Sequence, residues 1–231
     1  MSLFDTAGAT HVGRVRKNNE DSYVICNGQI LLAAVADGIG GHAHGEIASM
    51  LCCTGLAAKF NACKDLQEYD SAKTGEQLCS WIEEVNSSIF ERNKAEKNPL
   101  PMGSTLCAAI FTEQFTVCAN VGDSRLYCLD EDRELLLLTH DHTVRHNGGN
   151  FLSRAVGIVH KARPDVFVFK ADISDRYVLV SDGIYNSLSE NEIAEILAAG
   201  TDAGTTANEM IKRANECGGV DNLTVAAVFR R

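Results

Sequence analysis

Apolar residues gather in short segments that predict a chain rich in β-strands. Each segment combines β-branched or aromatic residues with other apolar residues and is bounded by glycine, asparagine, aspartate or other turn-forming positions. We expect strands at residues 21–27, 30–37, 104–112, 114–121, 124–129, 134–139, 165–171, 176–182 and 223–230.

Helical periodicity appears between the second and third of these segments. Apolar residues recur there at the i, i+3, i+4, i+7 and i+11 positions of an amphipathic helix. They are Leu78, Trp81, Ile82, Val85 and Ile89. A helix from about residue 46 to residue 60 precedes it and is apolar on most faces, so we expect it to lie against a sheet.

Two further helices are predicted before the last strand. Ser189 and Glu192 have the spacing of a capping box, and Gly200 stands where a helix would stop. The next helix would present Ala207, Met210, Ile211, Ala214 and Cys217 on one face. Runs of strands with helices grouped between them favour the α+β class over a βαβ alternation. With no linker or repeat in evidence, we expect a single domain over residues 1–231.

Composition and charge exclude several classes of partner. The chain has 231 residues, of which 45% are hydrophobic, and a formal net charge of -10. Because this charge repels a phosphate backbone, we expect no nucleic-acid ligand. No apolar run is long enough to cross a membrane, and the N-terminal residues lack the features of a secretion signal. We therefore expect a soluble cytoplasmic protein with no membrane partner.

The nine cysteines do not form a recognisable disulfide or zinc pattern. Their number is odd, Cys52 and Cys53 are adjacent, and no C-x-x-C pair occurs. We interpret them as small buried hydrophobic residues, with Cys26, Cys118 and Cys128 inside predicted strands.

The stretch "LLAAVADGIGGHAHGE" at residues 31–46 places Asp37 directly after an apolar strand. The pair Asp-Gly is also a common turn. The segment "GIGGHA" fits a loose dinucleotide-binding pattern, but Asp37 would repel a pyrophosphate and no second strand ending in an acid follows about 20 residues later. Zinc binding through His42 and His44 lacks a third ligand at a recognisable spacing.

Other acidic residues occupy positions comparable to that of Asp37. Asp182 again follows an apolar strand and precedes glycine, Asp123 lies between two strands, and Asp221 precedes the last strand. Carboxylates that meet at one sheet edge repel one another unless cations neutralise them, and oxygen ligands suit Mg²⁺ or Mn²⁺. A site for two metal ions follows as a hypothesis. Nearby in "GRVRKNNEDS", Arg16 could bind an oxyanion beside the acids Glu20 and Asp21.

Several motifs, taken in their order along the chain, resemble those of a known family. The chain resembles the metal-dependent protein phosphatases of type 2C, the PPM family, and specifically their bacterial branch. The resemblance covers nearly the whole chain and rests on "GATHVGRVRKNNEDS", "VADGIGGHAHGEIAS", "GSTL", "ANVGDSRLY", "LTHDHT", "LSRAVG", "RYVLVSDGIYNSLSENEI" and "DNLTVAAV". It implies a sandwich of two antiparallel β-sheets flanked by helices, with metals in a cleft at one end.

The resemblance also implies roles for individual residues. Asp37 would bridge two Mn²⁺ or Mg²⁺ ions, and the Gly38 carbonyl would bind the first. Asp182 and Asp221 would ligate the second ion, while Asp123 and Asp182 would hold a weaker third. Glu20 would act through metal-bound water, and Asp21 would support the residues next to the metal ligands. Arg16 would bind the substrate phosphate.

The implied activity is hydrolysis of phosphoserine and phosphothreonine in proteins. A water shared by the two ions would attack phosphorus in line, without a covalent intermediate and without a cysteine nucleophile. A cognate Ser/Thr protein kinase would be the partner whose action is reversed. Two alternatives stay open: a catalytically silent phosphoprotein-binding module on the same fold, which retention of the acids disfavours, and a phosphatase acting on small phosphomonoesters.

The sequence departs from the family pattern at two places. Many eukaryotic members carry a histidine where this chain has Ile39, so His42 is the candidate for a general acid or substrate contact, with a structural role as the alternative and His44 as a weaker candidate. The flap beside the active site is shortened, near residues 143–150, which would alter substrate selection. We interpret His140, His142 and His146 in this region as surface or structural residues.

Overall fold

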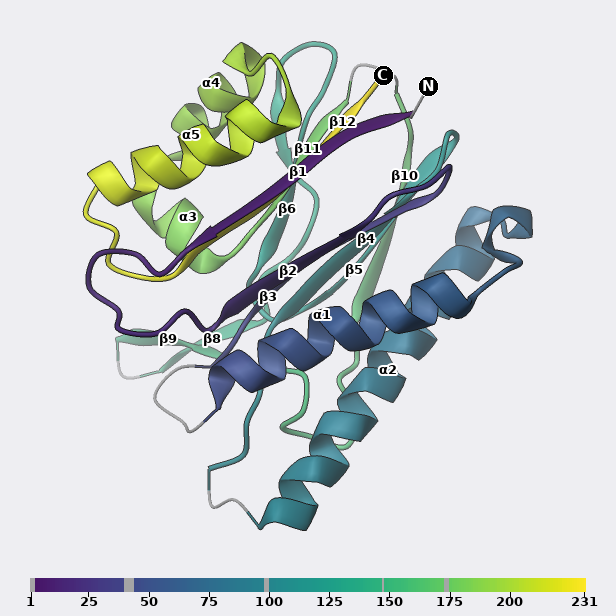
Figure 1. Cartoon of the computed structure of the whole chain (residues 1–231), viewed down its shortest axis with the longest axis vertical. Helices are drawn as coiled ribbons and strands as arrows, with labels where there is room; N and C mark the ends of the chain where they lie inside the picture. The colour runs from purple at the N-terminus through teal and green to yellow at the C-terminus, as the bar shows by residue number, and fades with distance from the viewer. Residues whose placement is uncertain (1–2, 40–43, 98–99, 147, 173–174) are drawn as a thin grey trace.

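The computed structural model describes residues 3–39, 44–97, 100–146, 148–172 and 175–231. Two antiparallel sheets stack face to face, and helices cover the outer face of each (Figure 1). This arrangement confirms the predicted α+β sandwich.

The first sheet has the strand order β1-β12-β11-β6-β7. Its strands are β1 (Phe4–His11), β12 (Leu223–Arg230), β11 (Arg176–Val180), β6 (Arg125–Leu129) and β7 (Leu135–Leu137). Strand β1 was not predicted, because "FDTAGATH" carries little apolar alternation. Its eight residues pair antiparallel with the whole of β12, so a neighbouring strand, and not local preference, makes this segment extended.

The second sheet has the order β10-β5-β4-β3-β2. Its strands are β2 (Asp21–Cys26), β3 (Leu31–Asp37), β4 (Leu106–Phe111), β5 (Phe115–Val121) and β10 (Asp165–Lys170). Together the two sheets contain a strand at each of the nine predicted positions. A separate hairpin, β8 (Thr143–His146) and β9 (Gly149–Leu152), was not predicted.

The central strands are buried on both faces, which explains their continuous apolar runs. In β3, Leu31, Ala33 and Val35 point into the core between the two sheets. The alternate residues of the strand, Leu32 and Ala34, point to the opposite side, into the core beneath the helices. Because side chains alternate along a strand, a layer between two others needs apolar residues at every position.

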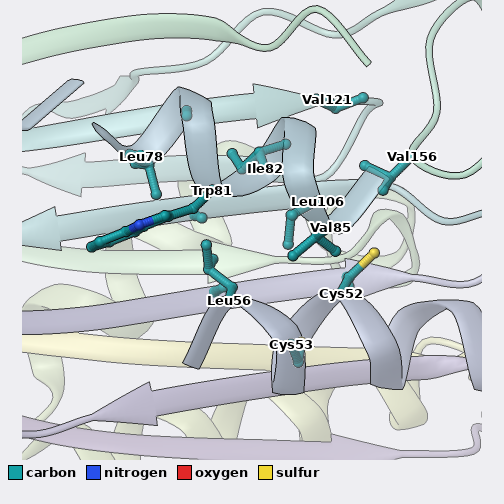
Figure 2. Close-up of a cluster of buried hydrophobic side chains, with 14 of the residues drawn as sticks. Cys52, Cys53, Leu56, Leu78, Trp81, Ile82, Val85, Leu106, Val121 and Val156 are labelled. Carbon is teal, nitrogen blue, oxygen red and sulfur yellow. The ribbon is translucent and has the colours of Figure 1, made fainter. Parts of the chain in front are cut away.

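Two long helices cover the second sheet. They are α1 (Gly45–Ala62) and α2 (Ser71–Glu96), joined through the short 3₁₀ helix η1 (Leu66–Glu68). Figure 2 shows Cys52 and Leu56 of α1 meeting Leu78, Ile82 and Val85 of α2, over strand residues of the sheet. The predicted apolar stripe of α2 is therefore its buried face.

Three helices cover the first sheet: α3 (Asp182–Ser187), α4 (Glu190–Ala199) and α5 (Ala203–Glu216). The predicted capping box is present, with the Ser189 and Glu192 side chains each accepting the other residue's backbone N–H, and Gly200 caps the end of α4. Helix α3 was not predicted, and Asp182 is its first residue, so the predicted strand 176–182 is too long at its end.

All nine cysteines are free. Cys118 and Cys128 lie in the core between the sheets, and Cys52, Cys53 and Cys107 are also buried. The interpretation of every cysteine as a buried residue is wrong for Cys217, which follows the end of α5 and is exposed, and for Cys26, Cys63 and Cys79, which are only partly buried. Among the described residues, no helix combines the length and the apolar character needed to cross a membrane.

Candidate active site

One cleft brings together the acidic residues singled out in the sequence. It has a volume of about 200 Å³ and lies where β3 ends and α1 begins. Figure 1 shows the start of α1 at one end of the sandwich. Its lining includes Arg16, Glu20, Asp37, Gly38, Asp123, Asp182 and Asp221. These residues come from the β1–β2 connection, the end of β3, the β5–β6 connection, the start of α3 and the turn before β12.

The backbone around Asp37 is held by the two residues that precede strand β4. The Thr105 hydroxyl accepts the Asp37 N–H at 2.9 Å, and the Asp37 carbonyl accepts the Thr105 N–H at 2.8 Å and the Ser104 hydroxyl at 2.9 Å. These bonds leave the Asp37 carboxylate as the group that faces the cleft. Thr105 was not assigned a role from the sequence, although it lies in the "GSTL" motif.

Gly38 is needed here because two backbone segments pass close to it. A Cβ at this position would lie 2.3 Å from the Gly45 carbonyl oxygen and 2.7 Å from the Glu20 carbonyl oxygen. The Gly38 N–H also donates to that Glu20 carbonyl at 3.0 Å. The absence of a side chain thus lets β3, the start of α1 and the residue before β2 converge at the cleft.

Asp182 and Asp221 are brought together by tight packing of α3 on the turn before β12. A Cβ at Gly183 would lie 2.0 Å from the Asn222 carbonyl oxygen, so only glycine allows this approach. Ser181 strengthens the junction, because its N–H donates to the Thr224 carbonyl and its hydroxyl accepts the Thr224 N–H, both at 3.1 Å.

The β1–β2 connection is fixed by Asn222, a residue that the sequence analysis did not assign. The Asn222 side chain accepts the Glu20 N–H at 2.8 Å and donates to the carbonyls of Val12 at 3.0 Å and Asn18 at 2.9 Å. Arg16, from the same connection, contacts the Asp221 carboxylate at 2.9 Å, and its side chain stays about half exposed at 46%. Arg16 therefore stands at the mouth of the cleft beside an acid.

Asp123 is held by contacts from two other elements. The Tyr185 hydroxyl of α3 donates to the Asp123 carbonyl at 2.9 Å. The preceding residue, Gly122, donates its N–H to Nδ1 of His142 at 3.1 Å and accepts the His142 N–H at 2.9 Å. With Nδ1 as acceptor, the proton of the neutral ring lies on Nε2, which donates to Asp165 at 3.0 Å. His142 is 6% exposed, which agrees with its interpretation as a structural residue.

Burial and mutual repulsion make these carboxylates hard to ionise together. Burial raises the pKa of Asp37 well above its usual range, and the charges of Asp21 and Asp182 raise it further. Burial, followed by the repulsion of Asp182, raises the pKa of Asp123 to about 6. Burial also raises the pKa of Asp21 to about 7, although a hydrogen bond from Ser181 lowers it. A cleft of this kind favours positive charge.

The donor set fits a hard divalent cation. Five carboxylates line the cleft, those of Glu20, Asp37, Asp123, Asp182 and Asp221, and no histidine or cysteine among the described residues does. Carboxylate oxygens are the ligands that Mg²⁺ and Mn²⁺ prefer. Next to this set, Oδ1 of Asp21 is buried without a hydrogen-bond partner in the part of the chain that the structure describes. Among the described residues, no group of three or more histidine, cysteine, aspartate or glutamate side chains is already arranged to hold a metal ion. This is expected, because carboxylates of like charge repel one another.

The remaining candidates of the sequence analysis lie elsewhere. His42 falls outside the described residues. His44 precedes α1, is about half exposed, and does not line the cleft. His140 and His146 are exposed. The segment expected to be a shortened flap forms the β8–β9 hairpin, and Leu152 at its end lines the cleft.

Comparison with known proteins agrees with this geometry. The protein phosphatase 2C family profile matches residues 7–222. The chain belongs to the protein phosphatase 2C family. It is 35% identical to the serine/threonine phosphatase stp of Listeria monocytogenes serotype 4b (strain F2365), over 96% of this chain and 94% of that protein.

Solved structures of bacterial phosphatases are also similar to this chain. The Mycobacterium tuberculosis serine/threonine phosphatase PstP/Ppp has a TM-score of 0.86 and 31% identity, covering 99% of both chains. The catalytic domain of PstP in complex with two manganese ions has a TM-score of 0.85 and 30% identity, again covering 99% of both chains. The chain is thus a protein serine/threonine phosphatase, and the alternative of a silent binding module is set aside.

Proposed function

We propose that this chain is a single catalytic domain that hydrolyses phosphoserine and phosphothreonine in proteins with the help of Mn²⁺ or Mg²⁺. The observation that supports this most strongly is the convergence of five carboxylates and Arg16 on one cleft. In this function the enzyme reverses the action of a Ser/Thr protein kinase.

The proposed ligands divide between two principal ions and a weaker third. Asp37 would be shared by the first two, the Gly38 carbonyl would help to hold the first, and Asp182 with Asp221 would hold the second. Asp123 and Asp182 would hold the third, and Glu20 would contribute through water. The bound ions would supply an activated water for attack on phosphorus and positive charge for the phosphoryl oxygens.

The chain's own groups orient the substrate and shape the site. Arg16 contacts Asp221 through one terminal nitrogen, so the other N–H groups of its guanidinium are available to phosphate oxygens. The Asn222 side chain keeps Arg16 and Glu20 at the cleft by holding the loop that carries them. We keep His42 as the candidate that donates a proton to the leaving oxygen. The β8–β9 hairpin, as a shortened flap, borders the cleft through Leu152.

The decisive experiment compares the wild type with Asp182→Asn. We expect Mn²⁺-dependent hydrolysis of a phosphothreonine peptide to fall by at least about 100-fold in the variant, together with its metal content, because a ligand shared by two ions is lost. Asp132→Asn is the matched control, since Asp132 is exposed in the turn between β6 and β7. A wild type that is inactive with Mn²⁺ and Mg²⁺, or an Asp182→Asn variant with full activity, would overturn the proposed site.

A further inference from the structure

A second hollow adjoins the acidic cleft. Its volume is about 280 Å³, and it shares two lining residues, Ile39 and Leu152, with the cleft. Its other walls include Pro101, Ile158 and Val159. The two spaces are therefore neighbours on one surface, separated by the side chains that they share.

The hollow is mainly apolar, although Ser153 and Arg154 also line it. The charge of the Arg154 guanidinium is already offset by Asp165, because one of its nitrogens lies 2.6 Å from the Asp165 carboxylate and 2.9 Å from the Arg163 carbonyl. A charged guest would lose its hydration, and the only charged group that lines the hollow among the described residues is already paired. An uncharged aliphatic side chain has no charge whose hydration it could lose, and it gains contact with the isoleucine and valine side chains.

The far wall of the hollow is held rigidly by α2. Two buried asparagines bind the loop that carries Ile158 and Val159: Asn86 accepts the Gly157 N–H at 2.8 Å and donates to the Val159 carbonyl at 3.0 Å, and Asn93 donates to the Gly157 carbonyl at 2.9 Å. Because the wall is fixed before any guest arrives, binding costs little conformational entropy.

Two isoleucines that line the hollow, Ile39 and Ile158, pack against Gly103. A Cβ at this position would lie 2.5 Å from Cδ1 of Ile158 and 3.0 Å from Cδ1 of Ile39. Both isoleucines pack over the glycine backbone, and the Ile39 N–H donates to the Gly103 carbonyl at 3.0 Å. The glycine thus leaves room for two apolar side chains that join the hollow to the cleft.

We propose that this hollow binds one aliphatic side chain of the protein substrate, within two residues of the phosphorylated serine or threonine. The inference rests on the proposed function. The volume lies just below the range of about 300–1,000 Å³ that encloses a drug-sized ligand, so it suits a single side chain. The hollow and the cleft share Ile39 and Leu152, and an extended peptide advances about 3.3 Å per residue, so a residue close to the phosphorylated one can reach the hollow.

The first experiment measures kcat/KM with Mn²⁺ for phosphothreonine peptides that differ at one position. Leucine, serine or aspartate replaces the residue one or two places before or after the phosphothreonine. At one of these places we expect leucine to exceed serine by about ten-fold, the effect of burying an aliphatic side chain, and aspartate to be the poorest. Peptides cleaved with no such preference at any of the four places would overturn the inference and leave the proposed function intact.

The second experiment tests the hollow itself with Val159→Asp. Val159 is 48% exposed, and we expect its replacement by a charged residue to reduce the ratio of leucine to serine peptides to within about two-fold. Val159→Ser gives a milder version if the aspartate variant folds poorly. Val168→Asp is the matched control, because Val168 of β10 is 49% exposed and borders neither space.

The outcomes separate the two proposals. Loss of the leucine preference in Val159→Asp but not in Val168→Asp supports the hollow as the binding site. A preference that survives in Val159→Asp and Val159→Ser places its origin elsewhere and overturns the inference. A wild type that cleaves no phosphopeptide with any divalent ion overturns the proposed function, and the inference falls with it.

Discussion

Asn222 shows how a residue without chemistry of its own can position a site. Its side chain joins the turn before β12 to the loop between β1 and β2 through three hydrogen bonds, to Glu20, Val12 and Asn18. Its backbone carbonyl is approached by Gly183 of α3. Three segments that carry proposed site residues therefore meet at one residue.

We expect Asn222→Ala to lower the free energy of unfolding by about 2 kcal/mol, because partly buried backbone groups lose their partners. Phosphopeptide kcat/KM should fall by at least about ten-fold, since Arg16 and Glu20 lose their support. Urea unfolding and steady-state kinetics measure both effects. Asn208→Ala is the control, because Asn208 makes one exposed bond, to the Gly204 carbonyl of its own helix. Equal effects of the two substitutions would contradict the positioning role.

At the scale of elements, the β8–β9 hairpin is tied to the sheets at its base. His142, just before β8, binds the β5–β6 connection through Gly122 and the start of β10 through Asp165. Its carbonyl accepts the N–H of Ser153, just after β9, at 2.8 Å. One buried imidazole thus links the hairpin to the loop that carries Asp123.

Replacement of His142 by alanine should loosen both the hairpin and the Asp123 loop. The Gly122 N–H would be left buried without a partner, and we expect a loss of about 2 kcal/mol in the free energy of unfolding. The activity with phosphopeptides should fall with it. His146→Ala on the same hairpin, where the side chain is exposed, should change stability by less than about 0.5 kcal/mol. A His142→Ala variant as stable as His146→Ala would show that this link is unimportant.

For the whole molecule, the cleft is a place where the two sheets repel each other. Asp37 comes from the second sheet, whereas Asp182 and Asp221 flank β11 and β12 of the first. Their carboxylates face one small space at the end of the sandwich. Cations bound between them would join the two halves.

Mn²⁺ should therefore raise the melting temperature of the wild type, and chelation should reverse the effect. At a concentration 100 times Kd, we expect a gain of about 2.7 kcal/mol in the free energy of unfolding. At the same ionic strength, Mn²⁺ should raise the melting temperature of Asp182→Asn much less than that of Asp132→Asn. Thermal unfolding followed by circular dichroism measures this. The prediction fails if Mn²⁺ stabilises the two variants equally.

The parts of the fold that were predictable carry a local signal. Strands such as β3 have apolar runs, α2 has an apolar stripe, and α4 has its capping box, all within a few consecutive residues. β1 and the β8–β9 hairpin lack such a signal. β1 becomes a strand because β12, more than 200 residues later, offers it a complete hydrogen-bonding edge.

The candidate acids can be recognised from local sequence, since Asp37 and Asp182 each follow an apolar strand and precede a glycine. The residues that support them become apparent in the folded chain alone. Asn222 and Glu20 are 202 residues apart in the chain, and His142 and Gly122 are 20 apart. The same holds for the apolar hollow, whose walls come from the segments around Ile39, Pro101 and Val159. Contacts of this kind depend on how the sheets and helices stack. A local pattern of side chains does not specify which residues, far apart along the chain, will meet.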